Sequence, residues 1–323
     1  MKTFLKWLGI LSGMLAAMVA IGLVVIHFKS QARLTRIYEL AEETVVIPTD
    51  AASLERGKHI FQFRGCEACH SGGGSLDVAQ DSHFDLPAQD LPSMEGNVYL
   101  DDPAIGTVVA SNLTSGKGGV ANQYADPDWV RAIRHGVRPD KTPLLFMPAT
   151  EFYYLSDADL GAVIAYITSA APVDHELPTS SLSWTGRVVM TLVPAVTFIP
   201  AELIAHAAPR PVAPEVGITP EYGEYLTYSC KVCHGLTMSG GPIPGFPSSW
   251  PPAPNLTFGE GSALPAWTEA EFLSTINTGV APDGRQLRGE YMPWGSYKFM
   301  SEDELKAVWL YLQSLPKLAY GSR

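Results

Sequence analysis

Two short stretches decide the fold of this chain: Cys66-Glu67-Ala68-Cys69-His70 and Cys230-Lys231-Val232-Cys233-His234. They hold all four cysteines of the 323-residue sequence, so none is left for a disulfide framework. If each stretch forms one helical turn, its two sulfurs and its imidazole are presented together to a single ligand.

The pattern Cys-x-x-Cys-His is the attachment signal for c-type haem. The two thiols add to the vinyl groups of the porphyrin, and the histidine is placed to ligate iron. A zinc site and a redox dithiol are the rival interpretations. Zinc ribbons space their cysteine pairs about 15–20 residues apart, whereas Cys69 and Cys230 are 161 residues apart. Neither flank has the βαβ pattern of a dithiol enzyme, and neither rival explains a histidine after both pairs. We therefore predict two haem c groups, held covalently by Cys66, Cys69, Cys230 and Cys233, with His70 and His234 as iron ligands.

The sequence around these motifs is repeated. Asn112-Leu113-Thr114 in the first repeat matches Asn255-Leu256-Thr257 in the second, and Met147-Pro148 matches Met292-Pro293. Because a thioether is a known axial ligand, we predict Met147 and Met292 as the second iron ligands. The alternative for each is ordinary core filling. Met94 and Met238 are weaker candidates.

The repeats differ in length. His70 and Met147 are 77 residues apart, and His234 and Met292 are 58 apart. We expect the 19 extra residues in the polar stretch Ser71–Gly106. His83 and His135 have no counterpart in the second repeat, and we interpret them as surface or loop histidines.

Supporting residues are predicted around each motif. The second imidazole nitrogen usually donates to a backbone carbonyl, for which Pro87 is the candidate in the first repeat and Pro242 or Pro244 in the second. Asn112, Asn255 and Arg285 are candidate contacts for haem propionates.

Both repeats have the pattern of helices joined by long loops. Thr219 before Pro220 and Asp126 before Pro127 are expected N-caps with proline at the first helical position. Ser156 and Ser301 are expected to begin capping boxes of the last helices. The period-two alternation typical of a sheet is hard to find.

Composition and charge narrow the function classes. Hydrophobic residues make up 46% of the chain, enough for two cores, and the formal net charge is −11. A nucleic-acid binder would carry the opposite sign.

The N-terminal region contains an uncharged stretch from Trp7 to Phe28, long enough to cross a bilayer. A cleaved signal peptide has a shorter apolar region, of about 7–15 residues, so we expect a retained anchor. Lys2 and Lys6 before the stretch are balanced by cations after it, so charge alone does not set its orientation. Residues 31–43 are predicted to form a short amphipathic helix. The domain expectations, in order, are an anchor at 1–30, a juxtamembrane linker at 31–47, a first domain at 48–172, a proline-rich linker at 173–216, a second domain at 217–317 and a tail at 318–323.

With both motifs, Asn-Leu-Thr and Met-Pro in order in each repeat, the chain resembles the class I cytochrome c superfamily, specifically membrane-anchored proteins with two tandem cytochrome c domains. The resemblance implies a mostly α-helical fold, with a transmembrane helix followed by two domains each wrapped around one covalent haem. It implies the axial pairs His70/Met147 and His234/Met292. It also implies haem attachment outside the cytoplasm, which places the haem domains on the periplasmic side of the inner membrane.

The leading functional hypothesis is an electron relay between a quinol-oxidising complex and a terminal oxidase or reaction centre. A fixed redox subunit of a dehydrogenase or of a respiratory or photosynthetic complex is a variant of it. Two six-coordinate irons leave no position for a substrate, which favours an electron-transfer protein over an enzyme. The alternative is a dihaem peroxidase or thiosulfate-oxidising cytochrome. The apolar segment Val188–Ile199 is too short for a second span, and a buried connector, an interfacial segment and a docking surface all fit it.

Overall fold

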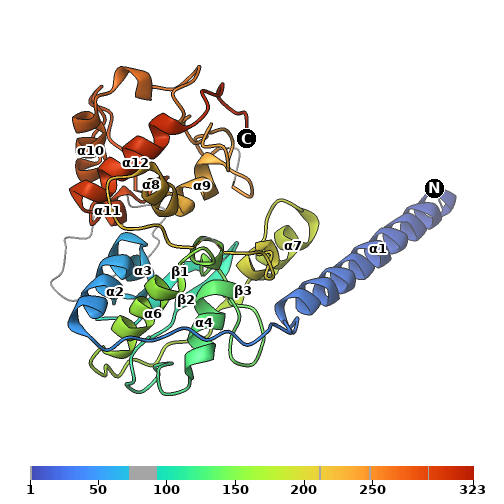
Figure 1. The fold of residues 1–323 in the computed structure, drawn as a ribbon. Helices are drawn as coiled ribbons and strands as arrows, with labels where there is room; N and C mark the ends of the chain where they lie inside the picture. Colours follow the sequence, from blue (N-terminus) through green and yellow to red (C-terminus); the bar gives the residue numbers. More distant parts are fainter. Residues whose placement is uncertain (1, 73–92, 211, 247–248, 290) are drawn as a thin grey trace.

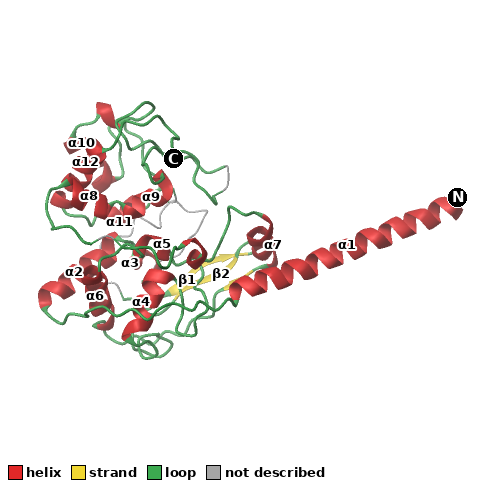
Figure 2. Ribbon diagram, turned by 45° about the vertical axis from the view of Figure 1, so that its right-hand side comes forward, coloured by secondary structure: helices red, strands yellow, loops and turns green. Residues whose placement is uncertain are grey.

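The computed structural model describes residues 2–72, 93–210, 212–246, 249–289 and 291–323. A long N-terminal helix projects from a body made of two packed units (Figure 1). Helices and loops make up nearly all of the body, with the strands gathered in the first unit (Figure 2). The prediction of a mostly α-helical fold is confirmed.

The two units contain corresponding helices in the same order. The helices of the first unit are α2 (Ala51–Phe63), α3 (Cys66–His70), α4 (Asp126–His135), α5 (Ala149–Phe152) and α6 (Asp157–Thr168). Those of the second are α8 (Pro220–Leu226), α9 (Tyr228–His234), α10 (Glu269–Thr278), α11 (Trp294–Tyr297) and α12 (Glu302–Ser314). The remaining helical elements are α1 (Lys2–Leu34), α7 (Trp184–Leu192) and the 3-10 turns η1 (Pro200–Leu203) and η2 (Leu264–Ala266).

Helix α1 is 33 residues long, and by length and composition it is able to cross a membrane. Its side chains are almost all exposed in the isolated chain, as expected for a helix whose partner is lipid. The prediction of a helix over residues 31–43 is wrong, because α1 ends at Leu34 and residues 36–49 are not helical. The chain is extended after α1 because Tyr38 N donates to Lys141 O at 3.0 Å and the Tyr38 side chain packs in a small core with Val137 and Met190.

The helix ends follow the predicted capping residues closely. Thr219 caps α8 by accepting a hydrogen bond from Tyr222 N, and Pro220 is the first helical residue. Ser156 and Ser301 accept from Asp159 N and Glu304 N at the starts of α6 and α12. For α4 the N-cap is Ala125 rather than Asp126, a shift of one residue.

Each unit is built on a close crossing of its first and last helices, α2 with α6 and α8 with α12. Gly57 makes the first crossing possible, because a Cβ there would lie 2.0 Å from the carbonyl oxygen of Ala162. Gly223 makes the second, with the same 2.0 Å to the carbonyl oxygen of Ala307. Only glycine lets the backbones approach this closely.

The first unit also contains a small antiparallel sheet that the sequence patterns did not predict. Strands β1 (Asn97–Asp102), β2 (Gly106–Ala110) and β3 (Ser181–Leu182) lie in that order, and β3 comes from the linker between the units. The register pairs Asn97 with Ala110. The second unit has the equivalent pair as an isolated bridge between Gly241 and Ala253. A shift of register between Val98 and Leu100 disrupts the strict alternation that would have revealed β1.

The structure also places the extra residues of the first unit more narrowly than the sequence did. Leu113 N donates to Met94 O, and Leu256 N donates to Met238 O, so Met94 and Met238 are equivalent. Met94 follows His70 by 24 residues, whereas Met238 follows His234 by four. The insertion therefore lies between His70 and Met94. Its residues 73–92, and with them His83 and Pro87, lie outside the described part of the chain.

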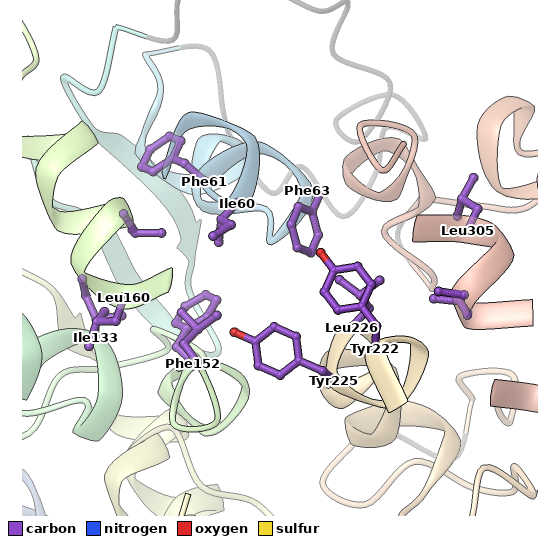
Figure 3. Close-up of a cluster of buried hydrophobic side chains, with 14 of the residues drawn as sticks. Ile60, Phe61, Phe63, Ile133, Phe152, Leu160, Tyr222, Tyr225, Leu226 and Leu305 are labelled. Carbon is purple, nitrogen blue, oxygen red and sulfur yellow. The ribbon is translucent and has the colours of Figure 1, made fainter. Parts of the chain in front are cut away.

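One hydrophobic core continues from the first unit into the second. It includes Ile60, Phe63 and Leu160 of the first unit and Tyr222, Leu226 and Leu305 of the second (Figure 3). A continuous core of this kind holds the two units together as one body.

A charged cluster joins the starts of α6 and α12 at the edge of this core. Arg56 Nε donates to Asp159 Oδ1 at 3.0 Å within the first unit, and its Nη1 reaches Glu304 Oε1 of the second at 3.2 Å. Glu304 Oε2 is also 2.7 Å from His59 Nε2. In return, the Tyr225 hydroxyl donates to Asp159 Oδ2 at 2.7 Å. The cluster fixes how the two units meet.

Candidate functional site: two paired cysteine–histidine motifs

Both motifs form short helices directly after the first helix of their unit. In the first unit, Gly65 turns the chain with a φ of +73° between α2 and α3, and α3 consists of Cys66–His70. In the second, α9 begins at Tyr228 and ends at His234. All four cysteines, each in the described part of the chain, are free thiols. Each motif therefore forms the helical turn that was predicted for it.

The two histidines are oriented in the same way. His70 Nδ1 lies 2.8 Å from the carbonyl oxygen of Ser111, and His234 Nδ1 lies 2.9 Å from that of Pro254. A carbonyl only accepts hydrogen bonds, so Nδ1 carries the proton and Nε2 keeps its lone pair. Burial lowers the pKa of both imidazoles, to about 4 for His234. Each histidine is thus a neutral imidazole with Nε2 prepared to bind a metal.

The predicted carbonyl partners of these histidines were wrong in both units, because His70 bonds to Ser111 O and not to Pro87. In the second unit the acceptor is Pro254, directly before the Asn-Leu-Thr motif, and not Pro242 or Pro244. Its equivalent in the first unit is Ser111, at the same place before its own Asn-Leu-Thr. The repeated tripeptide therefore marks the loop that orients the histidine.

Asn112 and Asn255 shape that loop and are not free to contact a ligand. The Oδ1 atom of each accepts from the backbone N–H and the hydroxyl of the threonine two residues later. Their Nδ2 atoms donate to backbone carbonyls, those of Val173 and Leu318 among them. Both asparagines are buried, so their predicted role at haem propionates is replaced by a structural one.

Met147 and Met292 also have equivalent surroundings. Each is half-buried against the main core and is followed by a proline that caps the next short helix, α5 or α11. The turn is the same in both, with Ala149 N donating to Met147 O and Trp294 N donating to Met292 O, each at 2.7 Å. Met94 and Met238 differ, because both are fully buried core side chains. The geometry is consistent with Met147 and Met292 as ligands, and the assignment stays a prediction.

The four cysteine thiols are in apolar surroundings that keep them protonated. Burial is the main cause that raises the pKa of Cys66 to about 12 and those of Cys69, Cys230 and Cys233 to about 11. A redox dithiol needs the opposite shift, toward the thiolate. Among the described residues no group of three or more His, Cys, Asp or Glu is arranged to hold a metal ion. Both rival interpretations of the cysteine pairs are therefore disfavoured.

Each motif segment contacts the other unit across the interface. Helix α5, after Met147-Pro148, packs against α9, and α11, after Met292-Pro293, packs against the end of α2. A Cβ on Gly65 would lie 3.3 Å from Ser296 Oγ of α11. The short helix after each methionine thus touches the motif segment of the other unit.

Two charged residues that the sequence did not single out lie at this interface. Arg64, two residues before Cys66, donates to Ser229 Oγ at 3.1 Å and to Tyr225 O at 3.2 Å in the second unit. Glu151 on α5 adds to the rise in pKa of all four cysteine thiols, which places it near both motifs. Burial raises the pKa of Glu151 itself to about 7, with Arg64 opposing the shift. Neither residue is repeated in the other unit, so the repeat pattern could not reveal them.

His135 also differs from its prediction as a surface or loop histidine. It is buried in the last turn of α4, where its Nδ1 lies 2.9 Å from His206 Nδ1 and its Nε2 lies 3.3 Å from Glu43 Oε1. It ties the extended segment before the first unit and the linker to α4.

Comparison with known proteins decides the family. The family model for cytochrome c matches residues 54–171 and 222–316, one match over each unit. The chain belongs to the cytochrome c family. The members of this family carry covalently bound haem c, and the residues present fit that group, because each motif offers two neutral thiols and an imidazole with a free Nε2 beside an apolar core.

The curated relatives of this cytochrome are subunits of dehydrogenases. It is 26% identical over 292 residues to the cytochrome c subunit of the quinone-dependent alcohol dehydrogenase of Gluconacetobacter polyoxogenes, covering 83% of this chain and 57% of that protein. It is 25% identical over 301 residues to the fructose dehydrogenase cytochrome subunit of Gluconobacter japonicus, covering 86% and 56%. It is 25% identical over 289 residues to the gluconate 2-dehydrogenase cytochrome c subunit of Pantoea cypripedii, covering 82% and 60%. The chain spans less than two thirds of the length of these relatives. What this chain shares with them is the cytochrome c family, and its N-terminal helix fits a membrane anchor.

Proposed function

We propose that this cytochrome is the dihaem electron-transfer subunit of a membrane-bound dehydrogenase, and that it passes electrons from the catalytic subunit toward the membrane quinone pool or a terminal oxidase. The observation that carries the proposal is the contact of each motif segment with the other unit. Helix α5 packs against α9, and α11 packs against α2, whose end leads into the first motif. Two carriers that meet along such an interface are able to exchange electrons within one chain. The names of the relatives supply the class of complex.

In this proposal the chain carries two haem c groups, each attached through one cysteine pair and held by its histidine and methionine. When bound, haem supplies an iron that gains and loses one electron. His70 and His234 bind through Nε2 while their Nδ1 atoms stay bonded to Ser111 O and Pro254 O. The thioethers of Met147 and Met292 complete the coordination and raise the reduction potentials. The apolar surroundings keep water away from both groups.

The location follows from haem attachment outside the cytoplasm. We place the N-terminus inside, α1 in the inner membrane and both units on the periplasmic side, as part of a respiratory chain. A peroxidase or thiosulfate-oxidising enzyme would need one iron with an open or displaceable ligand position. No observation on either unit favours that alternative, since both have the same methionine-proline turn.

The haem count is tested by intact mass and by the haemochrome spectrum of the purified chain. The wild type should carry two haems. The double variants Cys66→Ala/Cys69→Ala and Cys230→Ala/Cys233→Ala should each keep one covalent haem. A wild-type chain with a single haem would refute the dihaem proposal.

The ligand assignment is tested with Met147→Leu and Met292→Leu. Each variant should lose half of the methionine–iron charge-transfer absorption of the oxidised protein and should lower the potential of one haem only. Met94→Leu and Met238→Leu are matched controls that should leave the absorption unchanged. Loss of the band in a control would move the ligand to that residue.

The role in a complex is tested by gentle detergent extraction of native membranes, followed by a native gel stained for covalent haem. We expect the stained band to contain a dehydrogenase subunit. In that complex, the double cysteine variants should abolish substrate-dependent quinone reduction while reduction of a small artificial acceptor by the dehydrogenase subunit persists. Migration of the cytochrome alone would instead support a mobile tethered carrier.

A further inference from the structure

The apolar segment between the two units, Val188–Ile199, is fastened to the end of helix α1. Arg33 in the last turn of α1 donates to Met190 O and, at 3.1 Å, to Thr197 Oγ1. The same guanidinium is paired with Glu202, with Nε 2.8 Å from Oε1. Two residues earlier, Gln31 accepts a hydrogen bond from Arg187 at 3.0 Å. Helix α7 therefore lies beside the end of α1 at which the helix meets the body (Figures 1 and 2).

Because Arg33 bonds to both Met190 and Thr197, residues 191–196 between them form a loop that begins with the last two residues of α7. Leu192, Val193, Pro194 and Ala195 follow one another in this loop and are all exposed. Leu192 is 63% exposed and Val193 42% exposed. Trp184, at the start of α7, is 42% exposed. A run of four exposed apolar residues is unusual on a surface that faces only water.

The position of these contacts along α1 sets their depth. The uncharged stretch of α1 ends at Phe28, and Gln31 and Arg33 follow three and five residues later. At about 1.5 Å per residue, the contacts with α7 begin about 5 to 8 Å beyond the hydrocarbon layer, which is the headgroup region. An apolar loop anchored at that level needs to extend by only one or two residues to reach acyl chains.

The charges around the loop match the same location. Lys29 and Arg36 are exposed on α1 and just after it, at the level of the headgroups. Cations there attract the anionic lipids of a bilayer surface, and tryptophan is enriched at the membrane interface.

We propose that the 191–196 loop and α7 form a second membrane contact, which inserts Leu192 and Val193 into the headgroup–acyl boundary of the bilayer that α1 crosses. The proposal rests on the membrane anchor of the proposed function. The contact adds a second attachment point beside the span, so the body is held in one orientation relative to the bilayer.

The test uses the full haem-loaded chain in liposomes of phosphatidylcholine and phosphatidylglycerol. Single cysteines are introduced by Leu192→Cys and Val193→Cys and labelled with an environment-sensitive fluorophore. Ile21→Cys, within α1, reports on the anchor, and Val216→Cys, an exposed apolar residue of the linker, reports on a surface away from α1. Wild-type chain treated in the same way gives the labelling blank, and the haem spectrum confirms that each variant is folded.

Emission is compared in ordinary lipids and in lipids brominated on their acyl chains. We expect bromolipids to reduce emission at positions 21, 192 and 193 and to leave it unchanged at position 216. Reduction at 21 but not at 192 or 193 overturns the second contact while the anchor stands, and it would assign the loop to a protein partner. No reduction at position 21 would refute the anchor itself.

Discussion

The two units have the same order of helices, and comparing them separates the features that both haem domains keep from those that vary between them. Both keep the histidine bonded to the carbonyl before Asn-Leu-Thr, the methionine-proline turn and the glycine at the helix crossing. They differ in the insertion before Met94 and in the residues that cross the interface. The features kept in both units orient the motif histidine, form the turn at the methionine or set the crossing of the first and last helices. The differing residues Arg64 and Glu151 lie where the units meet each other.

The largest expected effect comes from the shared helix crossing. We expect Gly57→Ala and Gly223→Ala each to lower the free energy of unfolding by at least about 3 kcal/mol, because the new methyl group would overlap a backbone carbonyl that has no space to move. Gly217→Ala is the matched control, since a Cβ there meets only the Thr219 methyl group, at 4.0 Å. Calorimetry should show one lowered transition in either variant, as the core is continuous. Two separate transitions would show that the units fold independently.

A second large effect is expected at Glu304, where the units meet. Burial alone would raise its pKa, but the hydrogen bond and charge of His59, with Arg56, outweigh burial and lower the pKa from 4.5 to about 2. A carboxyl with a lowered native pKa stabilises the fold above its unfolded pKa, and the stabilisation is lost as the pH falls toward the native value. We expect Glu304→Gln to cost about 3 kcal/mol at pH 7 and almost nothing near pH 2.

The exposed neighbour Glu302, paired with Lys306 on the same helix, is the control for this effect. Glu302→Gln should change the unfolding midpoint little at any pH. If Glu304→Gln lost stability equally at pH 7 and pH 2, the effect would come from helix capping rather than from the ion cluster.

Much of this architecture could be predicted from the sequence because the same local signals occur in both repeats. The cysteine–histidine motifs, the methionine-proline turns and the serine and threonine caps are local signals, and each predicted its element to within a residue or two. The residues of the interface could not be predicted in this way. Arg64 and Glu151 act only because folding brings the other unit beside them, and neither has a repeated partner. The strand β1 was missed because its register shift breaks the alternation. The helix predicted over 31–43 fails because the Tyr38 side chain packs in a small core and its N–H donates to Lys141 O, contacts that only the folded chain creates.

Arg64 and Tyr228 sharpen the comparison, because each lies two residues before the first cysteine of its motif and contacts the opposite unit. Arg64 bonds to Tyr225 O and Ser229, whereas Tyr228 stacks on Tyr154 with ring centroids 4.5 Å apart. We expect Arg64→Leu to lower the free energy of unfolding by about 2 kcal/mol, because it removes the buried guanidinium together with its two hydrogen bonds. Tyr228→Leu should cost about 1 kcal/mol. The denaturant midpoints of the two variants show which substitution destabilises the fold more. A larger loss of stability for Tyr228→Leu than for Arg64→Leu would contradict this prediction.

The smallest expected effect concerns the backbone carbonyl of the second cysteine in each motif, which accepts a hydrogen bond from a different kind of side chain in each unit. In the first unit, Asn97 at the start of β1 donates to Cys69 O at 3.0 Å and to Ser71 O at 2.6 Å. In the second, Arg323 donates to Cys233 O at 2.6 Å from an exposed position. The buried amide of Asn97 is fixed by the sheet, whereas the exposed guanidinium of Arg323 exchanges its hydrogen bonds readily with water.

We expect Asn97→Ala to lower the free energy of unfolding by about 1 to 2 kcal/mol, and Arg323→Ala to lower it by less than about 0.5 kcal/mol. Hydrogen exchange of the amides in α3 and α9 measures both, and it should speed up at α3 far more than at α9. Equal acceleration would mean that the sheet does not stabilise helix α3 further. The hydrogen bonds from Asn97 and from Arg323 would then stabilise their motif helices equally, although the residues differ.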